Sequence, residues 1–299
     1  MSSVARSARP LGLWSATALV VGSMIGSGVF LLPASLAPYG AASLVGWGIT
    51  LGGAILLALT FSRLAARWPQ TGGPYVFARH GFGDATGFVV AWSYWVSIWC
   101  ANAAIAVAFA GSIGAIFPAL TSTPLRSAGC ALAALWTCSA VNLAGVREAG
   151  RMQLITTVLK LVPLLVFGGI ALWYVDGTHY APFNRSGEPM SGVVQATVAL
   201  TLWAFLGLEA ATVPAGAIDD AERTVPRATM LGTLLAGVAT ILACTVVLGL
   251  LPGNALQDSQ APMADAARAL WGPAAGIAIA ATQRPFRSRV RSHAALLTT

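Results

Sequence analysis

Long apolar segments alternate with short polar segments along this chain. An α-helix needs about 20 apolar residues to cross the roughly 30 Å of hydrocarbon in a bilayer. Segments of about this length predict seven helices, at about 11–36, 41–66, 85–117, 125–145, 152–175, 191–216 and 228–251. A shorter apolar segment near 271–282 predicts a partial eighth helix. The pattern therefore predicts an all-α polytopic membrane protein.

The first predicted helix contains an interruption. Its segment Gly22-Ser23-Met24-Ile25-Gly26-Ser27-Gly28-Val29-Phe30 holds three glycines within seven residues, and each costs about 1 kcal/mol of helix propensity relative to alanine. Unwound backbone persists in hydrocarbon only where protein covers it or where it lines a cavity. We therefore expect a binding site near the bilayer midplane, with the N–H groups of the half-helix from Val29 onward facing an anion such as a carboxylate. Alternatively, the glycines only allow neighbouring helices to approach.

A second interruption is predicted in the sixth helix. Gly207 and Glu209 lie in the middle of that apolar segment and Pro214 follows them, much as Pro33 follows the glycines of the first helix. Interrupted helices at corresponding places in two halves of a chain are typical of inverted-repeat transporters. The two interruptions therefore favour a transporter with one binding site between them.

Composition and charge agree with a membrane protein. The chain is 57% hydrophobic and 9% charged, whereas soluble domains carry about 25% charged residues. The net charge of +7 does not indicate a nucleic-acid partner, because the arginines follow the positive-inside rule. With a cytoplasmic N-terminus, nine arginines lie on the inner side (Arg6, Arg9, Arg63, Arg67, Arg79, Arg147, Arg151, Arg223 and Arg227) and three on the outer side (Arg126, Arg185 and Arg268). The four cysteines lie in apolar segments with no metal-binding spacing, and we expect neither a metal nor a cofactor.

Two ionisable residues within predicted helices are candidates for function. Glu209 is the only acid inside an apolar segment, and the cost of a charge in the membrane places it in a cavity or protonates it. It is a candidate for gating or proton coupling, or it forms a structural hydrogen bond between helices. Lys160 is the only lysine of the chain. It could replace a bound cation near the first interruption, or extend along the helix toward the membrane surface.

Polar and aromatic residues of two helices are candidates for substrate contact. Trp203 could gate the site or stack on a cationic substrate, although ordinary packing would also explain it. Tyr94, Ser97 and Asn102 lie on the third helix and could form hydrogen bonds with a substrate side chain. We find no HExxH motif and no paired acids within the membrane, which disfavours a membrane-embedded enzyme.

The C-terminal end of the chain breaks the pattern. The apolar segment 271–282 would rise only about 18 Å as a helix, and four arginines follow within residues 284–291. We expect a truncated or out-of-frame end, with a short basic cytoplasmic tail as the alternative. Residues 1–282 are then one transmembrane transporter domain. Its first repeat covers about 11–175, its second repeat begins at about 191–282, and residues 283–299 form an aberrant basic tail.

The motifs together resemble a known family. The segment 22–30 with Pro33, the Gly72-Gly73-Pro74-Tyr75 motif and the segment from Leu202 to Glu209 resemble amino acid–polyamine–organocation transporters. Bacterial arginine/agmatine antiporters are the most similar members, and the resemblance covers about residues 10–280. It implies a secondary transporter in the inner (plasma) membrane with a LeuT-like fold, in which twelve helices include two inverted five-helix repeats. It also implies proton-linked antiport of an amino acid or amine, and it is compatible with a homodimer.

The resemblance also implies where a substrate binds. Its α-carboxylate would meet the backbone at Ser27 and Gly28. Its α-amino group would meet backbone carbonyls near four residues: Ser23, Ile25, Trp203 and Leu206. Trp203 would act as an aromatic gate.

The third helix would contribute the remaining contacts. Asn102 and the backbone near Ser97 and Ile98 would face a guanidinium group, while Glu209 and Tyr94 would form a proton-sensitive inner gate. Two departures weaken this assignment. Lys160 replaces a small apolar residue of the arginine/agmatine antiporters, and helices 9 to 12 are absent. The alternatives are a truncated, non-transporting membrane fragment, or a permease for neutral amino acids or polyamines.

Overall fold

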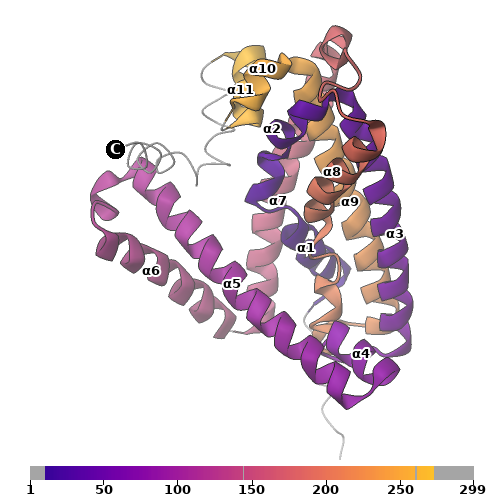
Figure 1. The fold of residues 1–299 in the computed structure, drawn as a ribbon. Helices are drawn as coiled ribbons and strands as arrows, with labels where there is room; N and C mark the ends of the chain where they lie inside the picture. Colours follow the sequence, from indigo (N-terminus) through magenta and orange to yellow (C-terminus); the bar gives the residue numbers. More distant parts are fainter. Residues whose placement is uncertain (1–10, 144, 260, 273–299) are drawn as a thin grey trace, which may run out of the picture.

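The computed structural model describes residues 11–143, 145–259 and 261–272. A bundle of helices stands beside a helical hairpin that projects away from it (Figure 1). The bundle consists of α1 (Leu13–Met24), α2 (Leu32–Leu36), α3 (Ser43–Arg67), α7 (Val146–Ala171), α8 (Met190–Leu202) and α9 (Ala221–Leu250). The hairpin consists of α5 (Asp84–Ile116) and α6 (Pro124–Leu143). Short helices lie at the two ends of the molecule: α4 (Pro74–Phe82) at one, and α10 (Gly253–Gln257) and α11 (Pro262–Trp271) at the other.

In the part of the chain that the structure describes, five segments are long and apolar enough to cross a membrane. They are Leu32–Arg67, Asp84–Gly111, Val146–Tyr174, Met190–Thr212 and Ala221–Leu250. The all-α polytopic prediction is therefore confirmed. The helix α1 is a shorter apolar helix of 12 residues, and α6 is not among the five. The predicted partial eighth helix and the basic tail 283–299 lie outside the described residues, apart from Trp271 and Gly272.

Two helices begin earlier than predicted. The helix α7 begins at Val146 rather than near residue 152, and α9 begins at Ala221 rather than near residue 228. In both cases the added first turns are charged, with Glu148 and Glu222 near the positive end of the helix dipole. The apolar pattern marks only the part of a helix that lies in hydrocarbon, so it underestimates helices that continue into the polar interface.

The centre of the bundle is α9. Of its most apolar stretch, 61% is buried, compared with 12% for α5. Glycines on α9 allow close packing: a Cβ at Gly232 would lie 2.5 Å from the Val20 Cβ of α1. A Cβ at Gly237 would lie 2.9 Å from the Phe205 ring. Small residues at such contacts let membrane helices approach closely.

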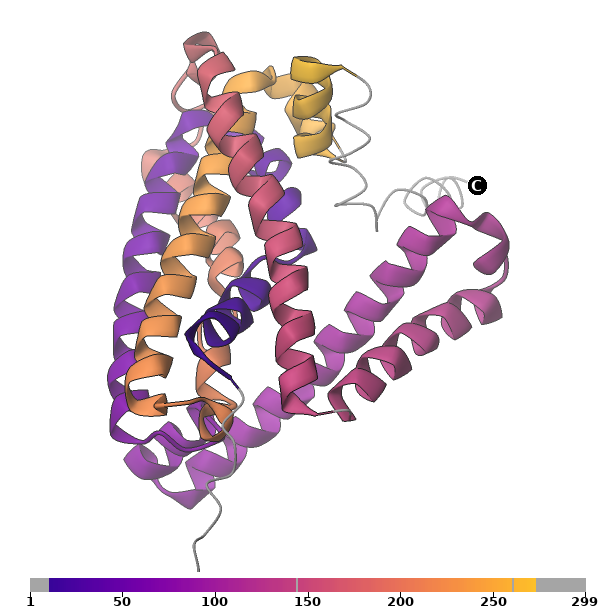
Figure 2. The ribbon, with the colours of Figure 1, turned by 180° about the vertical axis from the view of Figure 1, so that it is seen from behind.

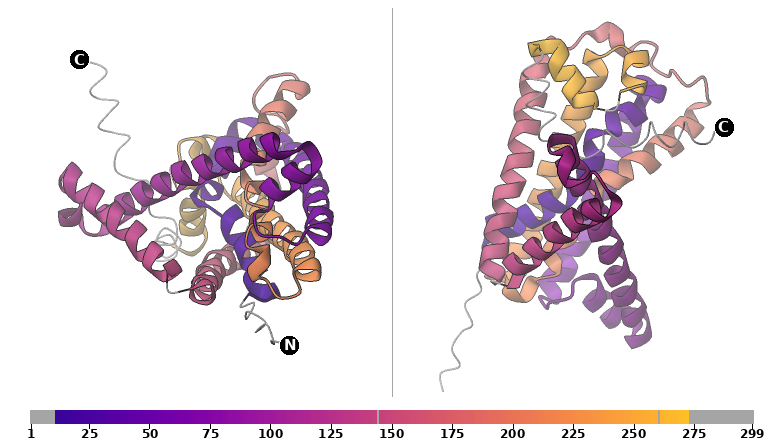
Figure 3. Two further views of the ribbon diagram at one scale, coloured as in Figure 1. Left: turned by 90° about the horizontal axis from the view of Figure 1, so that it is seen from below. Right: turned by 90° about the vertical axis from the view of Figure 1, so that its left-hand side faces the viewer.

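The α5–α6 hairpin has its own small core. Ala106 and Ala110 of α5 pack against Ala131 of α6, separately from the main cluster of buried residues. Figures 2 and 3 show both helices leaving the bundle together, so that much of each is surrounded by open space. The described part of α5 is therefore long and apolar but little buried.

The loop after α7 is fixed to the end of α9. The Tyr180 hydroxyl donates to the Thr245 carbonyl at 2.9 Å, and the His179 Nδ1 lies 2.9 Å from the Gly249 carbonyl. The Asp176 carboxylate accepts from the Thr178 N–H and hydroxyl at 2.8 and 2.7 Å. These two hydrogen bonds lower the pKa of Asp176 below its ordinary value of 3.8. The loop is therefore an ordered part of this end of the molecule.

Candidate functional site

The first span is interrupted where the glycines predicted. The helix α1 ends at Met24, and the backbone leaves helical geometry at Ile25 (φ −83°, ψ 85°) and Gly26 (φ −99°, ψ −177°). A short 3₁₀ helix, η1 (Ser27–Phe30), then leads to α2. The predicted interruption of this span is confirmed. The Ile25 and Gly26 N–H groups still donate to the Val21 and Met24 carbonyls, at 2.8 and 3.0 Å. The first N–H groups of the new turn, at Ser27 and Gly28, are those that helix geometry leaves without an intrahelical partner.

The sixth span is also interrupted, as predicted. The helix α8 ends at Leu202, and the 3₁₀ helix η6 (Trp203–Phe205) follows. Leu206 is extended, and Gly207 has a φ of +101°, a conformation that side-chain-bearing residues rarely adopt. The span then continues through Glu209 as 3₁₀ turns, η7 (Ala210–Thr212) and η8 (Ala215–Ala217), rather than as an α-helix.

The two interruptions meet. A Cβ at Gly207 would lie 2.7 Å from the Ser23 Cβ and 3.1 Å from its carbonyl carbon. On the other side of the break, a Cβ at Gly28 would lie 3.2 Å from the Trp203 Nε1. Only glycine fits at position 207, because both the backbone angle and the neighbouring backbone exclude a side chain. The structure thus brings together four of the residues singled out in the sequence: Ser23, Gly28, Trp203 and Gly207.

A polar stripe on α7 fixes the first break. The Gln153 amide and the Thr157 hydroxyl both donate to the Ala18 carbonyl, at 3.3 and 3.0 Å. The Lys160 Nζ donates to the Ile25 carbonyl at 3.4 Å, a long hydrogen bond to the first non-helical residue. Sequence reasoning identified Lys160 but missed the other two. Gln153, Thr157 and Lys160 are four and three residues apart within an apolar helix. This spacing was the available signal, because residues at such intervals share one face.

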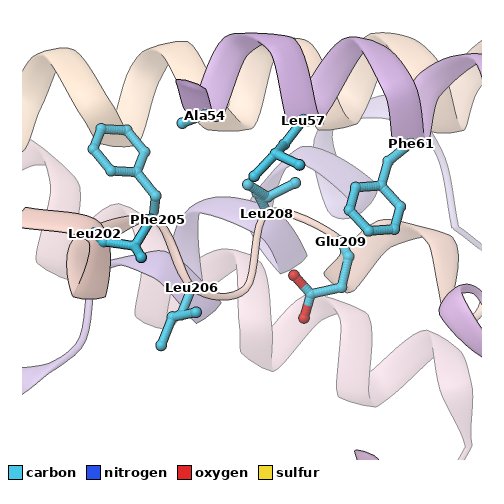
Figure 4. Close-up of a pocket in the computed structure, with 8 residues that line it drawn as sticks. All are labelled: Ala54, Leu57, Phe61, Leu202, Phe205, Leu206, Leu208 and Glu209. Atoms are coloured by element: carbon cyan, nitrogen blue, oxygen red, sulfur yellow. The ribbon is translucent and has the colours of Figure 1, made fainter. Parts of the chain in front are cut away.

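A cavity of about 210 Å³ separates α3 from the second break. Its lining is apolar except for Glu209 and consists of Ala54, Leu57, Phe61, Leu202, Phe205, Leu206, Leu208 and Glu209. Figure 4 shows Leu57 and Phe61 reaching from α3 toward Leu208, with the Glu209 carboxylate on the side of the unwound segment away from α3. Within the described residues, this carboxylate forms no salt bridge and accepts no hydrogen bond. It is therefore available to a cationic group.

The loop before α4 holds the second half of the second broken span. The Gly72 N–H donates to the Val213 carbonyl at 2.9 Å, and the Thr71 hydroxyl accepts from the Gly216 N–H at 3.2 Å. Gly73 has a φ of +50°, and a Cβ there would lie 2.4 Å from the Thr212 Oγ1. The Gly72-Gly73-Pro74-Tyr75 motif therefore has a physical role, which is to let this loop approach the 3₁₀ segment.

The candidate residues on α5 differ in how deeply they are buried. Tyr94 is half-buried and lies close enough to Glu209 to interact with its charge. Ser97, Ile98 and Asn102 are exposed, and the Ser97 hydroxyl donates to the Tyr94 carbonyl at 2.8 Å. Because α5 packs mainly on α4 and α6, the structure does not bring these three residues against the breaks.

Comparison with known proteins gives a consistent set of relatives. A family model described as amino acid permease matches residues 11–282. The cadaverine/lysine antiporter of Escherichia coli K12 is 36% identical over 267 residues, which are 89% of this chain and 60% of that protein. A putative arginine/ornithine antiporter of Bacillus subtilis 168 is 34% identical over 301 residues, covering 90% of this chain and 63% of its own length. The putrescine transporter PotE of Escherichia coli K12 is 31% identical over 274 residues (91% and 62%). The chain thus spans about three fifths of the length of these relatives.

Proposed function

The chain belongs to the amino acid permease family, within the amino acid–polyamine–organocation superfamily, and we propose that it exchanges a basic amino acid for an amine across the inner membrane. The observation that carries this proposal is the meeting of two interrupted spans, with the Gly207 backbone against Ser23 and the Trp203 indole over Gly28. Interrupted spans of this kind form the solute site of secondary transporters. The names of these relatives include lysine, arginine, ornithine, cadaverine and putrescine, and each of these molecules contains a cationic amine.

The amino-acid end of the substrate binds the breaks. Its carboxylate accepts from the N–H groups of Ser27 and Gly28, where the helical turn restarts and the dipole favours an anion. Its ammonium donates to carbonyls of four residues at the two breaks: Ser23, Ile25, Trp203 and Leu206. The exposed indole of Trp203 covers the site and attracts a cation through its ring face.

The side chain of the substrate sets the pair of molecules that is exchanged. Arginine and agmatine share a guanidinium group, which Asn102 and the backbone near Ser97 and Ile98 would recognise once α5 lies over the breaks. Lysine and cadaverine share a primary amine instead. The cadaverine/lysine antiporter supports the exchange of an amino acid for an amine, whereas the name of the arginine/ornithine antiporter pairs two amino acids. Competition measurements between these pairs of molecules would identify the substrate.

Lys160 and Glu209 give the protein its link to protons. The Lys160 ammonium, which donates to the Ile25 carbonyl, takes the place of a bound cation beside the first break, and loss of its proton would release this carbonyl. Glu209, with Tyr94 beside it, forms an inner gate whose charge depends on protonation. A Glu209→Gln variant should therefore change the pH dependence of flux.

The proposed arrangement in the membrane follows the charges. The end of the bundle that carries α4 also carries the ends of α3, α7 and α9 where Arg63, Arg67, Arg147, Arg151 and Arg223 lie (Figures 1 and 2). The positive-inside rule makes this the cytoplasmic side and makes the N-terminus cytoplasmic. The LeuT-like inverted repeat and a homodimer are parts of the same proposal.

Exchange in proteoliposomes tests the function. Vesicles that contain the purified chain are loaded with agmatine, cadaverine or putrescine, and uptake of labelled arginine or lysine is measured at several pH values. The proposal expects saturable uptake that requires an amine inside and is abolished by Gly207→Val. Absence of both saturable binding and exchange for all pairs would refute it. Saturable binding without exchange would refute antiport while retaining the binding site.

A further inference from the structure

A basic and aromatic cluster lies where α3 ends and α4 packs against it. We define this α3–α4 basic cluster as Arg63, Arg67, Trp68 and His80. The Arg67 guanidinium carbon lies 5.2 Å from the centre of the Trp68 ring, a distance at which a cation–π interaction forms. The His80 imidazole stacks on the same indole with 5.1 Å between ring centres and 6° between planes. The indole thus contacts both a guanidinium and an imidazole.

The charge of the cluster is not neutralised within the described part of the chain. Three other arginines at this end are paired within the described residues: Arg79 with Asp84 at 2.5 Å, Arg151 with Glu148 at 2.9 Å and Arg223 with Asp220 at 3.9 Å. Across residues 11–272, with the gaps given above, no carboxylate lies within ion-pair distance of Arg63 or Arg67. Both side chains are exposed. Two adjacent guanidinium groups therefore face outward without a counterion from the protein.

The surface that carries the two arginines continues as an apolar stripe. Leu56, Leu59, Arg63 and Arg67 recur at three- and four-residue intervals, so they lie along one face of α3. Leu56 and Leu59 are 66% and 38% exposed, whereas Ala54, Ala58 and Ala65 on the opposite face are buried. The face therefore carries arginines at the end of the span and leucines deeper in the membrane. A lipid has the same sequence of groups, with its phosphate at the surface and its acyl chain deeper.

The cluster also lies at the depth expected for lipid headgroups. The apolar segment that contains α3 ends at Arg67, and Trp68 follows immediately, as expected of an aromatic residue at the membrane interface. The helix α4 lies across this end with Phe77 packed on Phe61, and Phe82 at its far end is 79% exposed. An exposed phenylalanine beside a basic cluster is typical of helices that lie in the headgroup region.

We propose that the α3–α4 basic cluster binds the phosphate of an anionic phospholipid in the inner leaflet. The Arg63 and Arg67 guanidinium groups donate to the phosphate oxygens, and an acyl chain lies along Leu56 and Leu59. Guanidinium groups suit this role because their forked N–H donors match phosphate geometry. The apolar stripe selects a membrane lipid over free phosphate, since a free ion would gain nothing from the leucines. The site is separate from the broken spans and does not depend on the transported solute.

Native mass spectrometry of the purified chain tests this site. Dioleoylphosphatidylglycerol and dioleoylphosphatidylcholine are titrated against the protein and against Arg63→Gln/Arg67→Gln. The matched control is Arg151→Gln/Arg223→Gln, which removes two arginines from the same end of the bundle. We expect the first double variant to lose phosphatidylglycerol affinity about tenfold, with phosphatidylcholine unchanged, because each arginine near an anionic surface contributes appreciably. The control variant should lose less than threefold.

Three further measurements keep the interpretation clear. Unfolding temperatures of both double variants should match that of the parent chain, and Arg63→Lys/Arg67→Lys should retain part of the preference. Inorganic phosphate at millimolar concentration should not displace phosphatidylglycerol, whereas displacement would identify a free-phosphate site instead. Equal losses in the two double variants, or no preference of the parent chain for phosphatidylglycerol over phosphatidylcholine, would overturn the proposal.

Discussion

The bundle around the two breaks and the α5–α6 hairpin are both made of apolar helices, yet they are held in different ways. In the bundle, glycines bring backbones together, and two polar side chains of α7 donate to the Ala18 carbonyl of α1. In the hairpin, three alanines form a small core, and only 12% of the apolar stretch of α5 is buried. Hydrophobicity alone forms helices in both regions. In the bundle, contacts that tolerate no added atom join spans that are distant in the sequence, whereas in the hairpin such a contact, at Gly114, is made by Thr121 of its own connecting loop.

The largest expected effect is at Gly207. Gly207→Val places a β-branched side chain at a φ of +101° and against the Ser23 backbone. Strain and overpacking together should lower the free energy of unfolding by about 3 kcal/mol or more. Thermal or denaturant unfolding in detergent measures this.

The matched controls for Gly207 lie where an added Cβ meets open space. Gly48→Ala in α3 and Gly129→Ala in α6 have nothing within 4 Å of the new atom. Both should be neutral or stabilise the protein by up to about 1 kcal/mol, through helix propensity. If Gly129→Ala lowered the free energy of unfolding as much as Gly207→Val, the contrast between the two regions would be wrong.

A second effect is expected where α1 meets α7. A Cβ at Gly22 would lie 2.1 Å from the Gln153 Nε2 and 2.5 Å from the Thr157 Oγ1. Gly22→Ala should therefore destabilise the protein by about 2 kcal/mol. Adding Thr157→Ala and Gln153→Ala should recover part of this loss, and a thermodynamic cycle measures the coupling. Strict additivity would show that the α1–α7 contact does not constrain the break.

A third, smaller effect distinguishes buried from exposed hydroxyl groups. The Thr50 and Thr201 hydroxyls lie 2.7 Å apart in the buried contact between α3 and α8. Thr50→Val should cost about 0.6 kcal/mol, the average for such hydrogen bonds between membrane helices. Thr137→Val in the hairpin removes only a bond to the Ala133 carbonyl of its own helix, at an exposed position. Its effect on the unfolding temperature should be close to zero, and a larger loss there than at Thr50 would contradict the comparison.

The smallest expected effect depends on pH and lies outside the membrane. The pKa of Asp176 is lowered by the hydroxyl and N–H of Thr178, so its carboxylate form is favoured in the folded protein. The resulting stabilisation is present above the ordinary pKa of 3.8 and is lost as the pH falls through the lower folded value. The difference in unfolding temperature between the parent chain and Asp176→Ala should therefore shrink as the pH falls below 3.8. A difference that grows under acid would contradict the hydrogen-bond pattern.

The sequence identified the features of this protein that depend on local chemistry. A glycine cluster located the first break and Gly207 with Glu209 and Pro214 located the second, because the cost of such residues in a membrane helix is local, and the apolar segments located the helices. It did not identify the Gln153 and Thr157 contacts, the approach of Gly73 to Thr212, or the exposure of Asn102. These depend on which helix faces which, and hydropathy carries no such information. The early starts of α7 and α9 were missed because charged first turns interrupt the apolar pattern without interrupting the helix.

The central claim is that open peptide groups at the breaks bind the substrate, and hydrogen–deuterium exchange of the chain in lipid nanodiscs tests it most directly. The account predicts that amides at 26–29 and 206–209 exchange much faster than those within α1 and α8. Lysine or arginine should slow exchange at 27–29, whereas cadaverine or agmatine, which lack the carboxylate, should not. Amides at 26–29 that are as protected as the rest of α1, and unaffected by either amino acid, would contradict the account.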